Sequence, residues 1–138
     1  MTMETLKTST VTVPTTKKRI LIVEDDLAVS KFLGIRFRGL SFEVCSAYDG
    51  EQGLKEAKRL RPDLIILDLK LPKLTGEEVC KAIREDYDKK FAMTPIVMLS
   101  AKNADVDRVI GMVIGASCYV TKPFQIENLL KEMKKFNL

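Results

Sequence analysis

Short apolar runs alternate with longer amphipathic stretches along most of the chain. The apolar runs lie at 20–23, 42–45, 64–67, 96–99 and 118–120. After each run, hydrophobic residues recur at helical spacing, over about 27–39, 50–60, 76–86, 104–114 and 125–137. This alternation predicts five β-strands, each followed by an α-helix. Because the runs are almost continuously apolar, we expect one parallel sheet that helices cover on both faces.

Local signals support several boundaries of these elements. Thr75 and Glu78 have the spacing of a capping box, which predicts a helix that begins just after Thr75. Pro95 precedes the fourth apolar run, at a strand start where a missing N–H costs least. Gly115 follows the fourth helical stretch as its C-terminal cap. The boundaries therefore agree with the alternation.

The length and the N-terminal segment indicate how the chain is organised. A chain of 138 residues suits one domain. Residues 1–17 are polar and Thr-rich, so we expect a flexible tail ahead of a single domain at 18–138, with no output domain. The tail lacks the apolar core of a secretory signal, and no apolar run approaches the roughly 20 residues that span a bilayer. We expect a cytoplasmic protein without membrane insertion.

The composition excludes several kinds of chemistry. The chain has no histidine, which removes Ser-His-Asp catalysis and His-containing zinc sites. Its three cysteines have no CxxC spacing, so reduced thiols are expected. The net charge of +4 is spread along the chain, and no aromatic cluster accompanies the lysines, so we expect no DNA binding. Carboxylates, hydroxyls and lysines must carry the chemistry, and such hard oxygen ligands favour Mg²⁺ or Ca²⁺.

Polar residues that suit such chemistry follow four of the five apolar runs. They are Glu24, Asp25 and Asp26 after the first run, Asp68 after the third, Ser100 after the fourth, and Thr121 and Lys122 after the fifth. In an open α/β sheet, ligands bind outside the carboxyl ends of the strands. Carboxylates that converge there need a cation or a proton. A hydroxyl and an ammonium beside them suit an anion with several oxygens, such as a phosphoryl group.

Four motifs at these strand ends resemble the receiver domain of two-component response regulators, similar to the stand-alone chemotaxis type. They are IVEDD at 22–26, LIILDLKLPKLTGEE at 64–78, PIVMLSA at 95–101 and GASCYVTKPF at 115–124. The resemblance covers about 18–138. It implies a flavodoxin-like, doubly wound α/β fold, with five parallel strands in the order 2-1-3-4-5.

The resemblance also implies a phosphoacceptor and a metal site. Asp68 would accept a phosphoryl group from a phosphohistidine on a sensor histidine kinase or a histidine phosphotransfer protein. Asp25 and Asp68 would bind Mg²⁺, or Mn²⁺ in its place, together with the main-chain carbonyl of Lys70. Glu24 would act on the metal mainly through water.

Further residues are implied to respond to the phosphoryl group. Ser100 and Lys122 would bind its oxygens, and Tyr119 would be the aromatic switch that follows Ser100. The peptide bond before Pro123 is cis in the family. These roles describe a phosphorylation switch without small-molecule turnover.

The signal is expected to leave through the surface of the fourth helix, fifth strand and fifth helix. Val113 places an apolar side chain there, where the family commonly carries an acid. We expect an apolar protein-partner surface, with an unknown downstream protein and a phosphorylation-dependent homodimer as its candidate partners. A lone tolerated valine is the plainer alternative.

Other interpretations stay open from the sequence alone. Glu24 and Asp25 could cap the first helix, the role favoured for Asp26, and Asp68 could be a turn residue. A haloacid-dehalogenase-like phosphatase also uses an Asp nucleophile with Mg²⁺, but Lys70 stands where its second Asp is usual. A degenerate receiver that signals without phosphorylation is the remaining alternative.

Overall fold

A five-stranded parallel sheet forms the centre of the computed structural model, which describes residues 17–100 and 105–138. Its strands are β2 (Arg19–Val23), β3 (Glu43–Ala47), β4 (Leu64–Asp68), β5 (Ile96–Ser100) and β6 (Cys118–Thr121). They lie in the order β3-β2-β4-β5-β6, and every neighbouring pair is parallel. Counted along the chain this order is 2-1-3-4-5, so the predicted doubly wound sheet is confirmed.

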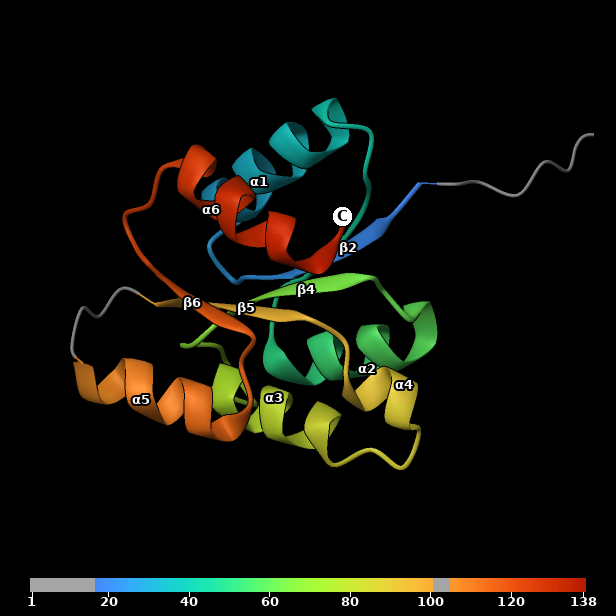
Figure 1. Ribbon diagram of the computed structural model, residues 1–138, viewed down its shortest axis with the longest axis vertical. Helices are drawn as coiled ribbons and strands as arrows, with labels where there is room; N and C mark the ends of the chain where they lie inside the picture. Colours follow the sequence, from blue (N-terminus) through green and yellow to red (C-terminus); the bar gives the residue numbers. More distant parts are fainter. Residues whose placement is uncertain (1–16, 101–104) are drawn as a thin grey trace, which may run out of the picture.

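Helices cover both faces of the sheet (Figure 1). One face carries α1 (Leu27–Gly39) and α6 (Ile126–Met133), with a 3₁₀ turn at Lys134–Phe136. The other carries α2 (Gly50–Leu60), α3 (Gly76–Arg84), α4 (Lys89–Ala92) and α5 (Asp105–Ile114). Alternate strand residues face the two layers, and each layer buries its own apolar cluster. The sheet is thereby packed between two layers of helices.

The predicted boundary signals behave as expected. The Thr75 hydroxyl accepts a hydrogen bond from the Glu78 N–H at 3.1 Å, and the Glu78 carboxylate accepts from the Thr75 N–H at 2.9 Å. Gly115 follows α5 with a φ of 117°, a conformation that favours glycine. The Lys122–Pro123 bond is cis, as the family resemblance implied.

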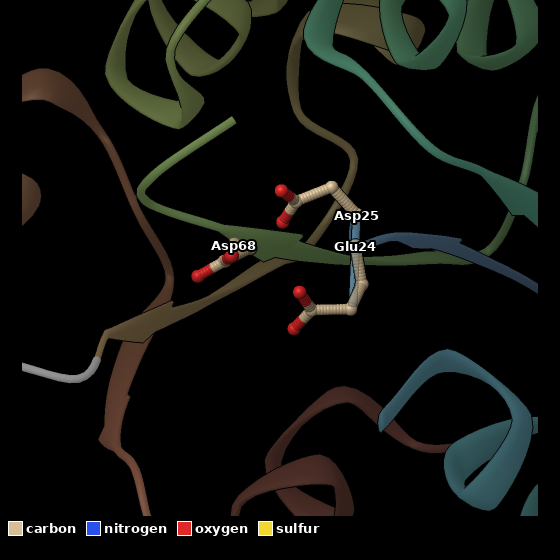
Figure 2. Close-up of side chains that lie close together, drawn as sticks. All are labelled: Glu24, Asp25 and Asp68. Atoms are coloured by element: carbon tan, nitrogen blue, oxygen red, sulfur yellow. The ribbon is translucent and has the colours of Figure 1, made fainter. Parts of the chain in front are cut away.

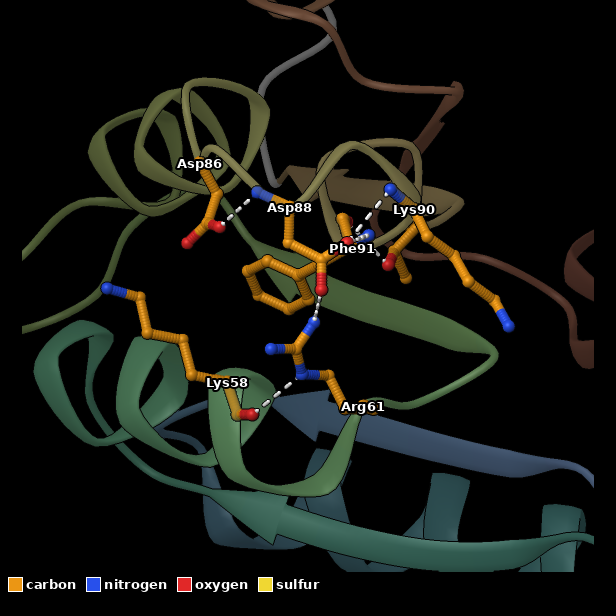
Figure 3. A network of polar contacts seen from close by, with 7 residues as sticks. Lys58, Arg61, Asp86, Asp88, Lys90 and Phe91 are labelled. Atoms are coloured by element: carbon orange, nitrogen blue, oxygen red, sulfur yellow. Dashed lines mark hydrogen bonds and ion pairs between the residues drawn. The ribbon is translucent and has the colours of Figure 1, made fainter.

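The short helix α4 is the element that periodicity missed. Asp88 caps it, accepting hydrogen bonds from the N–H groups of Lys90 at 3.1 Å and Phe91 at 3.2 Å. The Arg61 guanidinium lies 2.5 Å from the Asp88 carboxylate and 4.9 Å from the centre of the Phe91 ring (Figure 3). Because one turn is too short to show a helical period, these contacts from the end of α2 define it.

The predicted tail lies outside the described residues, apart from Lys17. None of the helices that the structure describes is both long enough and apolar enough to cross a membrane. The cysteines are free thiols, and burial raises the pKa of Cys118 to about 11.

Candidate functional site

Three carboxylates meet where β2 and β4 end side by side. Val23 pairs with Leu67, so the residues that follow them in each strand are brought together. Glu24, Asp25 and Asp68 each offer an oxygen, and these oxygens all lie within 4.8 Å of one another (Figure 2). Glu24 and Asp25 extend to opposite sides of the end of β2, with Asp68 beside them. Glu24 is 1% and Asp68 6% exposed, whereas Asp25 is open to solvent.

The ammonium of Lys122 lies among these acids. It comes from the loop after β6 and donates a hydrogen bond to a Glu24 oxygen at 2.6 Å. The nearest Asp68 oxygen is 3.5 Å away. The structure therefore brings together four of the residues that the sequence analysis selected, and pairs two of them in a way that was not predicted.

The electrostatic balance of this cluster is unfavourable to Asp68 as a carboxylate. Burial, and then the charge of Glu24, raise the pKa of Asp68 from its ordinary 3.8 to about 7, although Lys122 opposes the shift. For Lys122, burial alone favours the neutral amine, but the hydrogen bond to Glu24 and the charge of Asp68 outweigh it and raise its pKa. A further cation bound beside Asp68 would favour its ionised form and lower this pKa.

The donor set fits a small hard divalent cation. Carboxylate oxygens are the ligands that Mg²⁺ prefers, usually one or two of them with several waters. Asp25 lines an open pocket of about 520 Å³ together with Lys70, whose side chain points to solvent. Glu24 already accepts hydrogen bonds from Lys122 and, at 3.1 Å, from the Asp26 N–H. Both oxygens of Glu24 are thus engaged by the chain, whereas Asp25 and Asp68 could hold such an ion.

Asp26, the third acid of the first motif, has the separate role that was favoured for it. Its carboxylate accepts hydrogen bonds from the N–H groups of Ala28 at 2.9 Å and Val29 at 3.3 Å. It is the N-cap of α1 and does not belong to the acidic cluster.

Ser100 and Tyr119 lie on the next two strands. The Leu69 N–H bonds to the Leu99 carbonyl at 2.8 Å, which places the residue after Leu99, Ser100, beside the loop that follows Asp68. Ser100 is buried at the end of β5, opposite Thr121 of β6. Tyr119 is also buried, in the apolar cluster on the α3 and α5 face. The ring is therefore turned inward in this conformation.

Helix α3 begins directly against the end of β4, at Asp68 and Leu69. The Gly76 N–H bonds to the Leu69 carbonyl at 2.9 Å. A Cβ atom on Gly76 would lie 2.2 Å from the Asp68 carbonyl oxygen, closer than real contacts allow. The first residue of α3 must therefore be glycine for the backbone to approach this closely.

At its other end, α3 carries an arginine that the sequence analysis did not select. Arg84 donates hydrogen bonds to the carbonyls of Gly115 at 2.8 Å and of Ala92 and Thr94 at 2.7 Å. It also reaches the Ser117 hydroxyl at 3.3 Å. Burial lowers its pKa. The helical period of α3 could have flagged Arg84 as half-buried, but not its partners, which lie up to 33 residues away.

Comparison with known proteins identifies the family. Residues 20–134 match the model of the response regulator receiver domain, so the chain belongs to this family. It is 44% identical over 107 residues to the alkaline phosphatase synthesis transcriptional regulatory protein PhoP of Bacillus subtilis, covering 78% of this chain and 43% of that protein. It is 42% identical over 120 residues to the DNA-binding response regulator MtrA of Mycolicibacterium smegmatis, covering 87% and 50%. The chain thus spans about half the length of these relatives.

Solved structures agree with this assignment. The chemotaxis protein CheY4 of Vibrio cholerae is 31% identical, with a TM-score of 0.79 over 87% of this chain and 98% of that one. The BeF3-activated N-terminal receiver domain of Klebsiella pneumoniae RstA is 26% identical, with a TM-score of 0.78 over 86% and 97%. Receiver domains are signalling domains rather than classical enzymes, and they bind Mg²⁺ at an acidic pocket.

The expectation that DNA binding is excluded is wrong. It rested on the spread of charge and the few aromatic residues in this chain. Relatives named as DNA-binding response regulators match the chain over about half of their own length. The charge pattern of a receiver domain therefore does not report on DNA binding by a response regulator that contains it.

Proposed function

We propose that this receiver is a Mg²⁺-dependent phosphorylation switch whose phosphoacceptor is Asp68. The observation that carries the proposal is the position of Asp68, which is buried beside two further carboxylates and lies 3.5 Å from the Lys122 ammonium. An Asp68 oxygen would attack the phosphorus of a phosphohistidine on a partner protein. The P–N bond breaks, an acyl phosphate forms, and the histidine leaves as neutral imidazole once it is protonated.

The residues of the chain have distinct tasks in this transfer. When bound, Mg²⁺ would supply positive charge that offsets the repulsion between the Asp68 carboxylate and the phosphoryl oxygens. Asp25, Asp68 and the Lys70 carbonyl would hold it. Lys122 would pair with a phosphoryl oxygen, and the Ser100 hydroxyl would donate a hydrogen bond to another. The same contacts would stabilise the phosphorylated conformation.

The output surface that we propose comprises α5, β6 and α6, the fourth helix, fifth strand and fifth helix of the sequence analysis. Exposed apolar side chains on α5 support it: Val109, Ile110, Met112 and Val113, of which Val113 is 81% exposed. Such a group is typical of a surface that another protein covers. Tyr119 is a buried residue of β6, one of the elements of this surface. Phosphorylation would shift the population between two arrangements of this region.

The response regulators related to this chain suggest a second form of output. MtrA is named a DNA-binding response regulator, and PhoP a transcriptional regulatory protein. DNA binding by the protein that carries this receiver is therefore a candidate output, with α5, β6 and α6 as the surface that transmits the signal.

The proposed phosphorylation is tested by incubating the protein with acetyl phosphate and Mg²⁺ and measuring its intact mass. We expect an adduct of one phosphoryl group that is absent when EDTA replaces Mg²⁺ and absent in Asp68→Asn. Asp26→Asn is the matched control, because asparagine still caps α1 and Asp26 lies outside the cluster. A wild-type protein that forms no adduct would instead support the degenerate receiver.

A further inference from the structure

The loop that follows β4 contains a strained turn at Lys73. The Leu74 N–H donates a hydrogen bond to the Pro72 carbonyl at 2.9 Å, and the φ of Lys73 is 71°. A three-residue turn with a positive φ at its centre is the rare and strained form of γ-turn. A residue with a side chain persists in such a conformation only where its neighbours hold it there.

The start of α2 supplies this support. The Gly50 N–H donates to the same Pro72 carbonyl at 3.1 Å, and a Cβ on Gly50 would lie 1.9 Å from the Leu74 carbonyl oxygen. The backbone of α2 therefore contacts the loop on both sides of Lys73. The Asp49 carboxylate, which caps α2, also lies 3.8 Å from the Lys73 ammonium. Since ion pairs at the surface stabilise little, the backbone contact with Gly50 is the stronger of the two.

The same loop forms one side of the proposed metal site. It lines the open pocket of about 520 Å³ that also contains Asp25. The hydrogen bond between the Gly76 N–H and the Leu69 carbonyl closes the loop at its base. Lys70, whose main-chain carbonyl the proposed function assigns to the ion, lies within the loop, two residues before Pro72. A displacement of Pro72 would therefore also move the Lys70 carbonyl.

We propose that Gly50 is a positioning residue, which acts on the metal site through the turn at Lys73. It holds in place the loop that carries the Lys70 carbonyl, although it lies outside the acidic cluster. The inference rests on the proposed function, in which this carbonyl is a ligand of Mg²⁺. It adds that α2, which contributes no carboxylate to the cluster, sets the affinity of the site for the ion.

The physical reason is the entropic cost of ordering a ligand. A backbone carbonyl that must first be ordered contributes less to binding, because the entropy lost by the loop is subtracted from the binding free energy. Here the contact with Gly50 orders the loop before an ion arrives. The alternative is that this contact serves the stability of the fold alone and has no influence on metal affinity.

The variant Gly50→Ala separates these two roles. Its Cβ must displace the Leu74 carbonyl, so both roles predict a lower urea midpoint for the metal-free protein. Ala57→Gly is the control, because it weakens the same helix at a buried position two turns further along. We expect the Mg²⁺ Kd, measured from the NMR shift of the Asp25 amide, to rise about tenfold in Gly50→Ala and to stay unchanged in Ala57→Gly. Equal Kd values in the two variants would overturn the inference.

A second measurement uses the wild type, so it does not depend on the folding of a variant. If the contact with Gly50 favours metal binding, metal binding must strengthen that contact by the same factor. With Mg²⁺ at tenfold excess over its Kd, exchange of the Gly50 amide hydrogen should slow by up to about tenfold. The Arg61 amide, bonded to the Ala57 carbonyl at 3.0 Å at the far end of α2, is the reference and should change much less. Equal slowing of both amides, or none at Gly50, contradicts the inference.

The outcomes also separate this inference from the proposed function. An acetyl phosphate adduct on Asp68, together with equal changes at the two amides, would overturn the inference alone. The absence of an adduct on Asp68 would overturn the proposed function, whatever the two amides show.

Discussion

The charged residues at the two ends of the sheet differ in their partners and in the direction of their pKa shifts. At the carboxyl ends, Asp68 is buried among acids, and burial raises its pKa to about 7. At the amino ends, Asp88 lies at the surface, where hydrogen bonds from the Phe91 N–H and then from Arg61 lower its pKa. Arg84, also at that end, has four acceptors for its guanidinium. At the amino ends, the charged side chains are paired within the protein. At the carboxyl ends, the acidic cluster keeps negative charge that a bound cation can compensate.

The largest effect on stability should come from removing Arg84, at the amino ends of the strands. Arg84→Met leaves three carbonyls without their donor, and we expect it to lower the free energy of unfolding by about 3 kcal/mol. Urea denaturation measures this loss. Arg84→Lys, which restores one charge but not the fork of donors, should recover only part of it. A loss below about 1 kcal/mol, the typical worth of one hydrogen bond, would show that water replaces the arginine.

At the carboxyl ends of the strands, removing a charged side chain should instead raise the free energy of unfolding. The pKa of Asp68 is higher in the folded protein than its ordinary 3.8, so between these values the folded state binds more protons and its stability falls as pH rises. Asp68→Asn should therefore stabilise the metal-free protein at pH 8, by on the order of 2 kcal/mol, and much less at pH 4. Urea denaturation at both pH values in EDTA measures the difference. Equal effects at the two values would contradict the raised pKa.

Adding Mg²⁺ should reduce the contrast between the two ends. At a tenfold excess over its Kd, Mg²⁺ should stabilise the wild type by about 1.4 kcal/mol. The gain should disappear in Asp25→Asn and persist in Asp26→Asn, because only the former residue belongs to the cluster. Thermal unfolding with and without Mg²⁺ gives the values. Equal gains in both variants would place the ion elsewhere.

The smallest effect is expected at Asp88. Its replacement by alanine removes the cap of α4 and the ion pair with Arg61, whereas asparagine keeps the cap. Both variants should be destabilised less than Arg84→Met, with alanine the worse. The pKa of Asp88 is lower in the folded protein than its ordinary 3.8. Its contribution to stability is therefore present above pH 3.8 and is lost as the pH falls through the pKa of the folded state. Denaturation midpoints at pH 7 and pH 2.5 test this.

The sequence revealed the features that depend on local pattern. Continuous apolar runs predicted the strands, and because parallel strands end at one edge, the acids after β2 and β4 could be placed together. Helix α4 could not be found in this way, since one turn has no period and is held by Arg61 from α2. Strand β3 was placed at 42–45 but runs to Ala47, because pairing with β2 continues past its apolar residues.

Within the site, residue identity was predictable but pairing was not. Asp25, Asp68, Ser100 and Lys122 were all selected from strand ends. The contact between Glu24 and Lys122 joins residues 98 apart, and no spacing rule selects Glu24 over Asp68 as the nearer partner. That choice depends on the longer Glu24 side chain and on its second bond, to the Asp26 N–H.

The close approach of α3 to the Asp68 backbone also bears on how this chain can change. Gly76 has no room for any side chain, while a Cβ on Gly39 at the end of α1 would meet nothing within 4 Å. A library of random variants selected for phosphorylation should therefore retain glycine at 76 and accept most residues at 39. The end of β4 and the start of α3 would then be retained together, so grafting the proposed phosphoacceptor into another receiver requires moving Asp68 and Gly76 together.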